Sequence, residues 1–225
     1  MNISVIIPVL NEARTIAVTL ESLTRLAPYE VIVVDGGSTD RTMEICQQAG
    51  VKIMVSARGR AQQMNFGAHY ASGNVLLFLH ADTRLPDSAF RDIATALRDP
   101  RYLGGRFDVA LEGAHWMLKV IGAMINYRSR LSKVATGDQA IFVRRSVFKR
   151  IGGYRDIPLM EDIALCRTLK RMGKIACLKS RVITSARRWE SDGIWRAIFR
   201  MWALKLLYIA GVSPGRLKQY YVDAR

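Results

Sequence analysis

The first hundred residues alternate between short, continuously apolar runs and longer segments in which apolar residues recur every three or four positions. The apolar runs predict buried strands at residues 3–10, 30–35, 51–57 and 74–82. The periodic segments predict helices at residues 12–23, 40–50 and 59–73. Apolar strands that alternate with helices are typical of a parallel sheet whose two faces are covered by helices, which predicts an α/β fold.

The second half of the chain has a less regular pattern. It predicts strands at 102–111 and 138–143, separated by a helical stretch rich in Met, Ile and Arg. A helix at 160–174 has a single apolar face, formed by Ile163, Cys166, Leu169 and Met172. The segments 115–131 and 194–210 are amphipathic and basic, so each is expected either to pack on the core or to lie in a membrane interface.

Composition narrows the class of protein. A chain of 225 residues with 50% hydrophobic residues is large enough for one sizeable core. Its net charge of +15 indicates an anionic partner, which could be nucleic acid, an anionic membrane surface or a phosphorylated substrate. The three cysteines form no CxxC pair, which argues against a disulfide framework or zinc knuckle and favours a reducing cytosol. The apolar N-terminus lacks a preceding basic region, so we interpret it as a first strand rather than a signal peptide, and no run approaches the ~20 apolar residues of a membrane span.

Polar residues follow each of the four predicted strands. In an open α/β sheet, ligands bind beyond the carboxyl ends of the strands. The residues expected to meet at that edge are Asn11, Glu12, Asp35, Arg58, Arg60, His80 and Asp82. Taken together, these four loops predict a binding site.

His80 and Asp82 are the sharpest feature of this edge. Residues i and i+2 of an extended segment point the same way, so both side chains could face one ligand. A divalent ion that carries a diphosphate favours oxygen ligands, and Mn²⁺ tolerates imidazole. The alternative is that Asp82 caps the turn that follows and His80 is a half-buried structural histidine.

The other polar residues also have two interpretations. Arg58 and Arg60 precede a helix and could bind an anion with its N-terminus, or lie on a basic surface. Asp35 ends an apolar strand, where it could accept hydrogen bonds from a nucleobase or ribose. Glu161 and Asp162 begin a helix, where acids are favoured by the helix dipole, but one of them could be a general base.

Two further polar clusters lie in the second half. Gly137, Asp138 and Gln139 stand directly before a strand and are candidates for the acceptor side of a site. The segment TSARRWE, residues 184–190, places two arginines beside Trp189. This segment is either solvated surface or a clamp for a diphosphate.

Six motifs in order along the chain resemble those of family 2 glycosyltransferases with the GT-A fold: VIIPVLNEA, VIVVDGGSTD, LLFLHADTRLP, GDQAIFVRRSVFKRIGGY, MEDIALCRTLKRMGK and ARRW. The match extends from Ile3 to about Glu190. HADT and ARRWE are most similar to a small bacterial branch labelled radical-SAM- or selenodomain-associated, or arsenosugar-biosynthesis, glycosyltransferase. The resemblance implies a GT-A domain at 1–190, with a nucleotide half at about 1–100 and an acceptor half at about 101–190, followed by a helical extension at 191–225.

The resemblance also implies roles for residues that bind the donor. Pro8, Asn11 and Glu12 would line the nucleotide pocket, and Asp35 would hold the base, usually uracil. Asp82 would be the second, metal-binding acid of the DxD motif, with His80 in the place of the first acid. Arg58 and Arg60 are the expected anion contacts.

The catalytic roles implied by the resemblance fall in the second half. Asp162 would be the catalytic base of the ED motif, with Glu161 beside it. Arg188 and Trp189 resemble the RW of the QxxRW motif, near the diphosphate and the acceptor. The reaction implied is an inverting transfer of a sugar, of the hexosyltransferase type, from a nucleoside-diphosphate sugar, with UDP expected, to an acceptor hydroxyl, assisted by Mn²⁺ or Mg²⁺.

Three positions depart from the family pattern. Gly36 stands where a second acid is usual. His80 replaces the first acid of DxD, and this departure bears on both ribose recognition and metal affinity. Ser185 replaces the Gln of QxxRW, which argues against a processive synthase.

The expected partners are a nucleotide-sugar donor and an acceptor of unknown identity for which a lipid-linked molecule is one candidate. The protein is expected in the cytoplasm or on the inner face of the cell membrane. Segments 115–131 and 194–210 are the expected sites of peripheral membrane contact.

Two alternatives stay open. A nucleotidyltransferase would need a Gly-rich basic loop after the first strand. This chain has PVLNEAR there, which contains no glycine and argues against that class. A basic nucleic-acid- or membrane-surface-binding module would be favoured by aromatic platforms on exposed strands, but the tryptophans lie mostly elsewhere, and nucleic acid is not expected.

Overall fold

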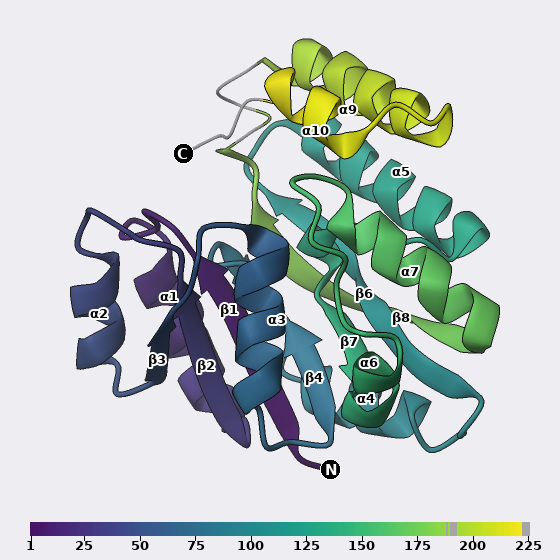
Figure 1. The fold of residues 1–225 in the computed structure, drawn as a ribbon. Coiled ribbons are helices and arrows are strands. Elements are labelled where there is room, and N and C mark those ends of the chain that lie inside the picture. Colours follow the sequence, from purple (N-terminus) through teal and green to yellow (C-terminus); the bar gives the residue numbers. More distant parts are fainter. Residues whose placement is uncertain (188, 190–192, 222–225) are drawn as a thin grey trace.

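The computed structural model describes residues 1–187, 189 and 193–221. Its described residues form an eight-stranded mixed sheet in the order β3-β2-β1-β4-β7-β6-β8-β5, with helices packed against it (Figure 1). The α/β fold predicted from the sequence is confirmed.

The first half of the sheet is parallel, as the hydrophobic pattern predicts. Its strands are β1 (Ile3–Val9), β2 (Glu30–Asp35), β3 (Lys52–Val55) and β4 (Val75–Phe78). β1 pairs in parallel with β2 and β4, and β2 pairs in parallel with β3. Because parallel strands end at the same edge, the loops after β1, β2, β3 and β4 meet there.

The helices of this half are α1 (Ile16–Leu26), α2 (Thr42–Gln48), α3 (Arg60–Tyr70) and α4 (Ala89–Ala96). Successive residues of β1 contribute to opposite cores: Val5 and Ile7 share one with α1, α2 and α4, whereas Ile6 shares the other with α3. A strand covered on both faces needs apolar residues throughout, which explains the continuous apolar runs. The predicted buried face of α1, formed by Ile16, Leu20 and Leu23, is confirmed.

The second half of the sheet is mixed. Its strands are β5 (Thr83–Arg84), β6 (Tyr102–Glu112), β7 (Ile141–Arg144) and β8 (Lys174–Ser185), and the turn before β7 is the 3-10 helix η1 (Gly137–Gln139). β7 runs antiparallel to β4 and β6, while β6 and β8 are parallel. The sequence pattern did not predict β8, because it follows a helix across Gly173 alone and mixes apolar with basic residues.

Among the predicted strands, two differ from the structure by three residues or more at one end. The fourth strand ends at Phe78 instead of continuing to residue 82, because Ala81 and Asp82 form a turn. The strand predicted at 138–143 begins only at Ile141, because its first residues belong to η1.

The remaining helices are α5 (Trp116–Ser132), α6 (Arg145–Arg150), α7 (Glu161–Met172), α9 (Ile194–Ile209) and α10 (Pro214–Gln219). α9 lies beside α10, above the edge of the sheet and close to α5 (Figure 1). On α7, Ile163, Cys166 and Leu169 are buried as predicted, but Met172 is 40% exposed. Among the described residues, no helix has the length and apolar character needed to cross a membrane.

Candidate active site

A cleft of about 930 Å³ lies at the carboxyl edge of the sheet, between the strand ends and the helices α5, α9 and α10. It brings together most of the residues that the sequence predicts for the site. Those that line it are Pro8, Glu12, Arg58, Arg60, His80, Asp82, Gly137, Asp138, Glu161, Asp162 and Trp189. Asn11, Asp35 and Gln139 do not line it, and Arg188 lies outside the described residues.

Asn11 and Asp35 hold the loops that follow β1 and β2. Asn11 adopts a left-handed conformation with φ 55°, donates its N–H to Ser38 Oγ over 2.9 Å and accepts from the N–H of Thr39 over 2.8 Å. The buried Asp35 carboxylate accepts from the N–H of Gly37 and of Ser38, each over 2.9 Å. Both side chains therefore give the floor of the cleft a fixed shape.

Gly36 lies close to a buried side chain that leaves little space for a Cβ. The buried Gln63 of α3 also lines the cleft, and its Nε2 donates to the carbonyl oxygens of Val9 and Val34, over 2.7 and 2.8 Å. A Cβ at position 36 would lie 3.1 Å from the Gln63 amide group. Gln63 thus occupies the space next to Gly36, where the family usually has a second acid. Sequence reasoning missed this glutamine, because nothing in a helical segment marks one polar residue as buried.

His80 and Asp82 both line the cleft, but they reach it from a turn. Because the segment is not extended, the argument that i and i+2 face the same way does not hold. The turn is fixed from both sides: Thr19 Oγ1 donates to the Ala81 carbonyl over 2.8 Å, and the Ser185 N–H donates to the Asp82 carbonyl over 3.2 Å. Both contacts come from other elements, so the position of Asp82 is determined by tertiary structure.

Asp162 is held by backbone donors at the start of α7. Its Oδ2 accepts from the N–H of Gly137 over 2.8 Å, and its Oδ1 accepts from the N–H of Ile163 over 2.7 Å. Gly137 also packs against His80, so that a Cβ added there would lie 2.5 Å from His80 Nε2. The glycine therefore permits a close approach that connects the Asp82 turn with the carboxylate of Asp162.

Glu161 and Asp162 form a pair of adjacent carboxylates with unusual electrostatics. Glu161 is only 5% exposed, and its Oε1 lies 3.9 Å from Arg60 Nη1. Burial, together with repulsion from Asp162, raises the pKa of Glu161 to about 7, although Arg60 opposes the rise. Burial also raises the pKa of Asp162, and its two N–H donors limit that rise. A carboxylate with a raised pKa at the edge of a cleft is suited to accept a proton near neutral pH.

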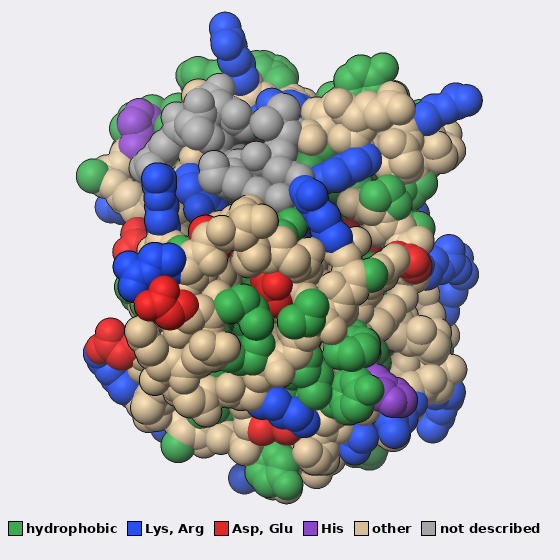
Figure 2. All heavy atoms as spheres, turned by 60° about the vertical axis from the view of Figure 1, so that its left-hand side comes forward, with side chains coloured by type: hydrophobic (Ala, Val, Ile, Leu, Met, Phe, Trp, Pro, Cys, Tyr) green, Lys and Arg blue, Asp and Glu red, His purple; other side chains and the backbone are tan. Residues whose placement is uncertain are grey.

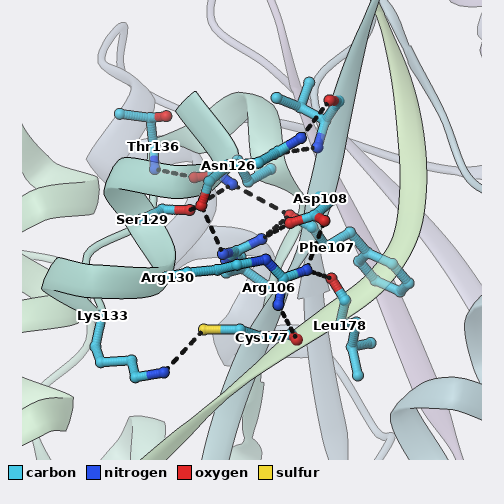
Figure 3. A network of polar contacts seen from close by, with 12 residues as sticks. Arg106, Phe107, Asp108, Asn126, Ser129, Arg130, Lys133, Thr136, Cys177 and Leu178 are labelled. Carbon is cyan, nitrogen blue, oxygen red and sulfur yellow. Dashed lines mark hydrogen bonds and ion pairs between the residues drawn. The ribbon is translucent and has the colours of Figure 1, made fainter. Parts of the chain in front are cut away.

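A buried polar network joins β6 and α5 (Figure 3). The Asp108 carboxylate of β6 pairs with Arg106, which is 1% exposed, and with Arg130 Nη2 of α5 over 2.5 Å. Gln139 Nε2 of η1 donates to Ser129 Oγ of α5 over 3.0 Å. Because η1 also carries Gly137, the network positions the N–H group that donates to Asp162.

Positive charge surrounds the cleft. Arg187 Nη2 lies 3.3 Å from Glu12 Oε2, and both residues line the cleft beside Arg58 and Arg60. On the face seen in Figure 2, Lys and Arg side chains stand around the upper part, near the end of the molecule where α9 and α10 lie. Arg187 belongs to the TSARRWE segment that the sequence marks as a candidate anion clamp.

The side chains at the turn that contains Asp82 fit a divalent ion only when a bound phosphate contributes further ligands. Among the described residues, no group of three His, Cys, Asp or Glu side chains is placed to hold a metal. The Asp82 carboxylate lines the cleft, with Thr83 Oγ1 donating to its Oδ1 over 3.3 Å. Mg²⁺ is commonly held by one or two carboxylates together with substrate phosphates and water, and the cleft can supply the carboxylate part of that set.

Comparison with known proteins agrees with this geometry. Residues 4–152 match the model of the family described as glycosyl transferase family 2. A PGL/p-HBAD biosynthesis glycosyltransferase of Mycobacterium bovis is 31% identical over 167 residues, which cover 67% of this chain and 62% of that protein. The probable glycosyltransferase YdaM of Bacillus subtilis is 25% identical over 92% of this chain and 56% of its own length. The chain thus spans about three fifths of the length of these curated relatives.

Two solved structures share the fold. Glucosyl-3-phosphoglycerate synthase of Mycobacterium tuberculosis, in complex with Mn²⁺, UDP and glucosyl-3-phosphoglycerate, superposes with a TM-score of 0.65 at 20% identity, covering 92% of this chain and 79% of that one. S. aureus TarS in complex with UDP-GlcNAc has a TM-score of 0.63 at 20% identity, covering 82% of this chain and 58% of that one. The family match extends over most of the sheet and its carboxyl-edge loops. The chain therefore belongs to glycosyl transferase family 2.

Proposed function

We propose that this protein transfers a sugar from a UDP-sugar to an acceptor hydroxyl, with inversion at the anomeric carbon and assistance from a divalent metal. The observation that carries the proposal is that Asp162 and Asp82 line one cleft at the carboxyl edge of the sheet. One carboxylate is thus available for proton transfer, and the other for a metal-bound diphosphate. The family match favours this function over the nucleotidyltransferase and the binding modules that the sequence left open.

The donor is proposed to lie over the ends of β1 and β4. Pro8 and Glu12 line this part of the cleft, and Arg60 and Arg187 supply positive charge for the diphosphate. Asp82, with His80 beside it, would hold Mn²⁺ or Mg²⁺, which when bound neutralises charge on the departing diphosphate. Hydrogen bonding of the base by Asp35 stays a prediction, and in this structure the Asp35 carboxylate is engaged by its own loop.

The chemical step follows from the position of Asp162. The acceptor oxygen attacks the anomeric carbon from the face opposite the diphosphate, and the hydroxyl proton passes to Asp162. The bond between the anomeric carbon and the diphosphate oxygen breaks, and its electron pair leaves with UDP. Arg60 stabilises the negative charge that develops on the leaving group. Burial raises the pKa of Asp162, which raises its proton affinity as a base.

The neighbours support the donor class. Of the two solved structures, one contains UDP with Mn²⁺ and the other contains UDP-GlcNAc. Both share the present fold, and each holds a uridine nucleotide or its sugar. Membership of the branch that carries HADT and ARRWE stays a prediction.

Calorimetric titration of UDP, with and without Mn²⁺, tests the donor site. We expect metal-dependent binding, which Asp82→Asn weakens by about tenfold or more, because a charge-assisted contact worth roughly 1.5–3 kcal/mol is lost. Asp87→Asn is the matched control, because Asp87 is an exposed acid that lies just beyond β5 and does not line the cleft. The absence of UDP binding under both conditions would overturn the proposal.

Peripheral membrane contact through 115–131 and 194–210 is a second part of the proposal. Trp116 on α5 and Trp195 and Phe199 on α9 are each more than 60% exposed. Tryptophan and basic residues on one surface favour an anionic lipid interface. Co-sedimentation with phosphatidylglycerol vesicles should be lost in Trp195→Ser/Phe199→Ser. Equal sedimentation of the protein with and without vesicles would contradict this part of the proposal.

A further inference from the structure

The cleft has two parts of different character. Its floor, at the strand ends, is polar and carries the residues proposed to bind the donor. Its other wall is formed by apolar side chains of α5 and α9. These side chains are Ile121, Met124, Ile125, Ile198, Met201, Trp202, Leu206 and Ile209. A nucleotide sugar has no hydrocarbon chain to place against so long an apolar wall.

Part of the apolar wall is exposed to solvent, although Ile121 is only 4% exposed. Met124 is 48% exposed, Trp202 is 56%, Leu206 is 61% and Ile209 is 66%. Only Ala197 and Leu204 of α9 are buried. Large exposed apolar patches next to a site indicate a ligand or partner that covers them.

Cations line the same cleft as the apolar wall and the proposed catalytic acids. Arg128 of α5 and Arg167 of α7 line the cleft, together with Lys205 and Lys218. The Nε of Arg128 is buried, and among the described residues it has no hydrogen-bond partner. A buried donor without a partner is costly unless a ligand satisfies it. These charges are additional to Arg58, Arg60 and Arg187 on the donor side.

We propose that the acceptor is an anionic lipid whose head group carries the accepting hydroxyl, an inference that rests on the proposed function. Its hydrocarbon chain lies against the wall formed by α5 and α9. Its anionic group lies against Arg128 and Arg167. The cleft is continuous from this wall to Asp162, so the head-group hydroxyl reaches the base. The oxygen of this hydroxyl bonds to the anomeric carbon, and the hydroxyl proton passes to Asp162. UDP leaves with the electron pair of the bond between the anomeric carbon and the diphosphate oxygen.

Binding of decyl phosphate below its micellar concentration, measured by calorimetry on the full chain, tests this inference. Decyl phosphate should bind, and both butyl phosphate, which lacks the chain, and decyl maltoside, which lacks the anion, should bind at least tenfold more weakly. Burial of several methylene groups at about 0.8 kcal/mol each makes the chain-length effect large. Equal binding of the three probes would overturn the inference.

Two matched pairs of variants locate the site. Leu206 lines the cleft, whereas Leu207 next to it is 44% exposed and does not. Arg128 lines the cleft, whereas Lys119 on the same helix is exposed and does not. Leu206→Gln and Arg128→Gln should weaken decyl phosphate binding about tenfold, and Leu207→Gln and Lys119→Gln should leave it unchanged. Arg128→Lys should recover part of the affinity. Equal losses within each pair would show adsorption to the surface and overturn the inference.

A UDP titration on the same samples separates this inference from the proposed function. If UDP binds with Mn²⁺ and decyl phosphate does not, the lipid acceptor is wrong and the donor site stands. If decyl phosphate binds in the cleft and UDP does not, the assignment of the lipid as an acceptor is overturned together with the proposed function.

Discussion

The two sides of the cleft are built in opposite ways. On the donor side, loops are tied by their own side chains: Asn11 binds the Ser38–Thr39 loop, Asp35 accepts from Gly37 and Ser38, and Gln63 joins the ends of β1 and β2. On the acceptor side, α9 keeps most of its large apolar residues exposed. The difference fits a preorganised polar site for the proposed donor and an apolar wall that the proposed acceptor would cover.

Removal of the proposed base should have the largest effect on activity. In Asp162→Asn the amide cannot take the acceptor proton, so turnover should fall roughly 10²–10⁴-fold. UDP affinity should change little, because the substitution leaves the donor side intact. Steady-state transfer assays with UDP-sugars, paired with UDP calorimetry, measure both. Retention of full turnover would remove Asp162 from the mechanism.

The network behind η1 should be the most sensitive point for stability. Asp108→Ala leaves Arg106 and Arg130 without their carboxylate and should lower the free energy of unfolding by roughly 3–5 kcal/mol. Chemical denaturation measures this loss. Glu21→Ala removes only the exposed ion pair with Arg25 and is the control with little expected change. A similar effect in the two variants would contradict the structural role of the network.

The buried acid pair should make stability depend on pH. The pKa of Glu161 is about 7 in the native state, above its ordinary 4.5, so the native state holds this proton more tightly than the unfolded chain does. The stabilisation from protonated Glu161 is therefore present at about pH 4.5 and lost as the pH rises to about 7, by up to about 3 kcal/mol. Glu161→Gln should flatten this decline in urea unfolding.

A smaller effect should follow from filling the space beside Gly36. In Gly36→Ala the new Cβ meets the Gln63 amide at 3.1 Å, so its hydrogen bonds to β1 and β2 should weaken. We expect a loss of about 1 kcal/mol in stability and a modest loss of UDP affinity. In a Gln63→Ala background the same change should cost less. Gly215→Ala, where a Cβ meets open space within α10, is the control that should lose no stability, because alanine favours a helix more than glycine does.

Much of the donor half followed from the sequence. Continuous apolar runs indicated strands covered on both faces, and the parallel arrangement placed the polar loops at one edge. The positions of Glu12, Arg60 and Asp82 in one cleft agree with that reasoning. The strand geometry assumed for His80 and Asp82 does not agree with the structure, because a turn held by α1 and β8 replaces the end of the strand.

The sequence by itself determined the α/β class, the polar edge and the acids at the start of α7, because these follow from local periodicity and from chain connectivity. Only the tertiary structure decided that β8 completes the sheet, that Gln63 takes the space beside Gly36, and that the apolar side of α9 faces the cleft and solvent. Strand pairing and side-chain burial depend on residues far apart in the chain. A periodic pattern can show that a helix has an apolar side, but it cannot show what covers that side.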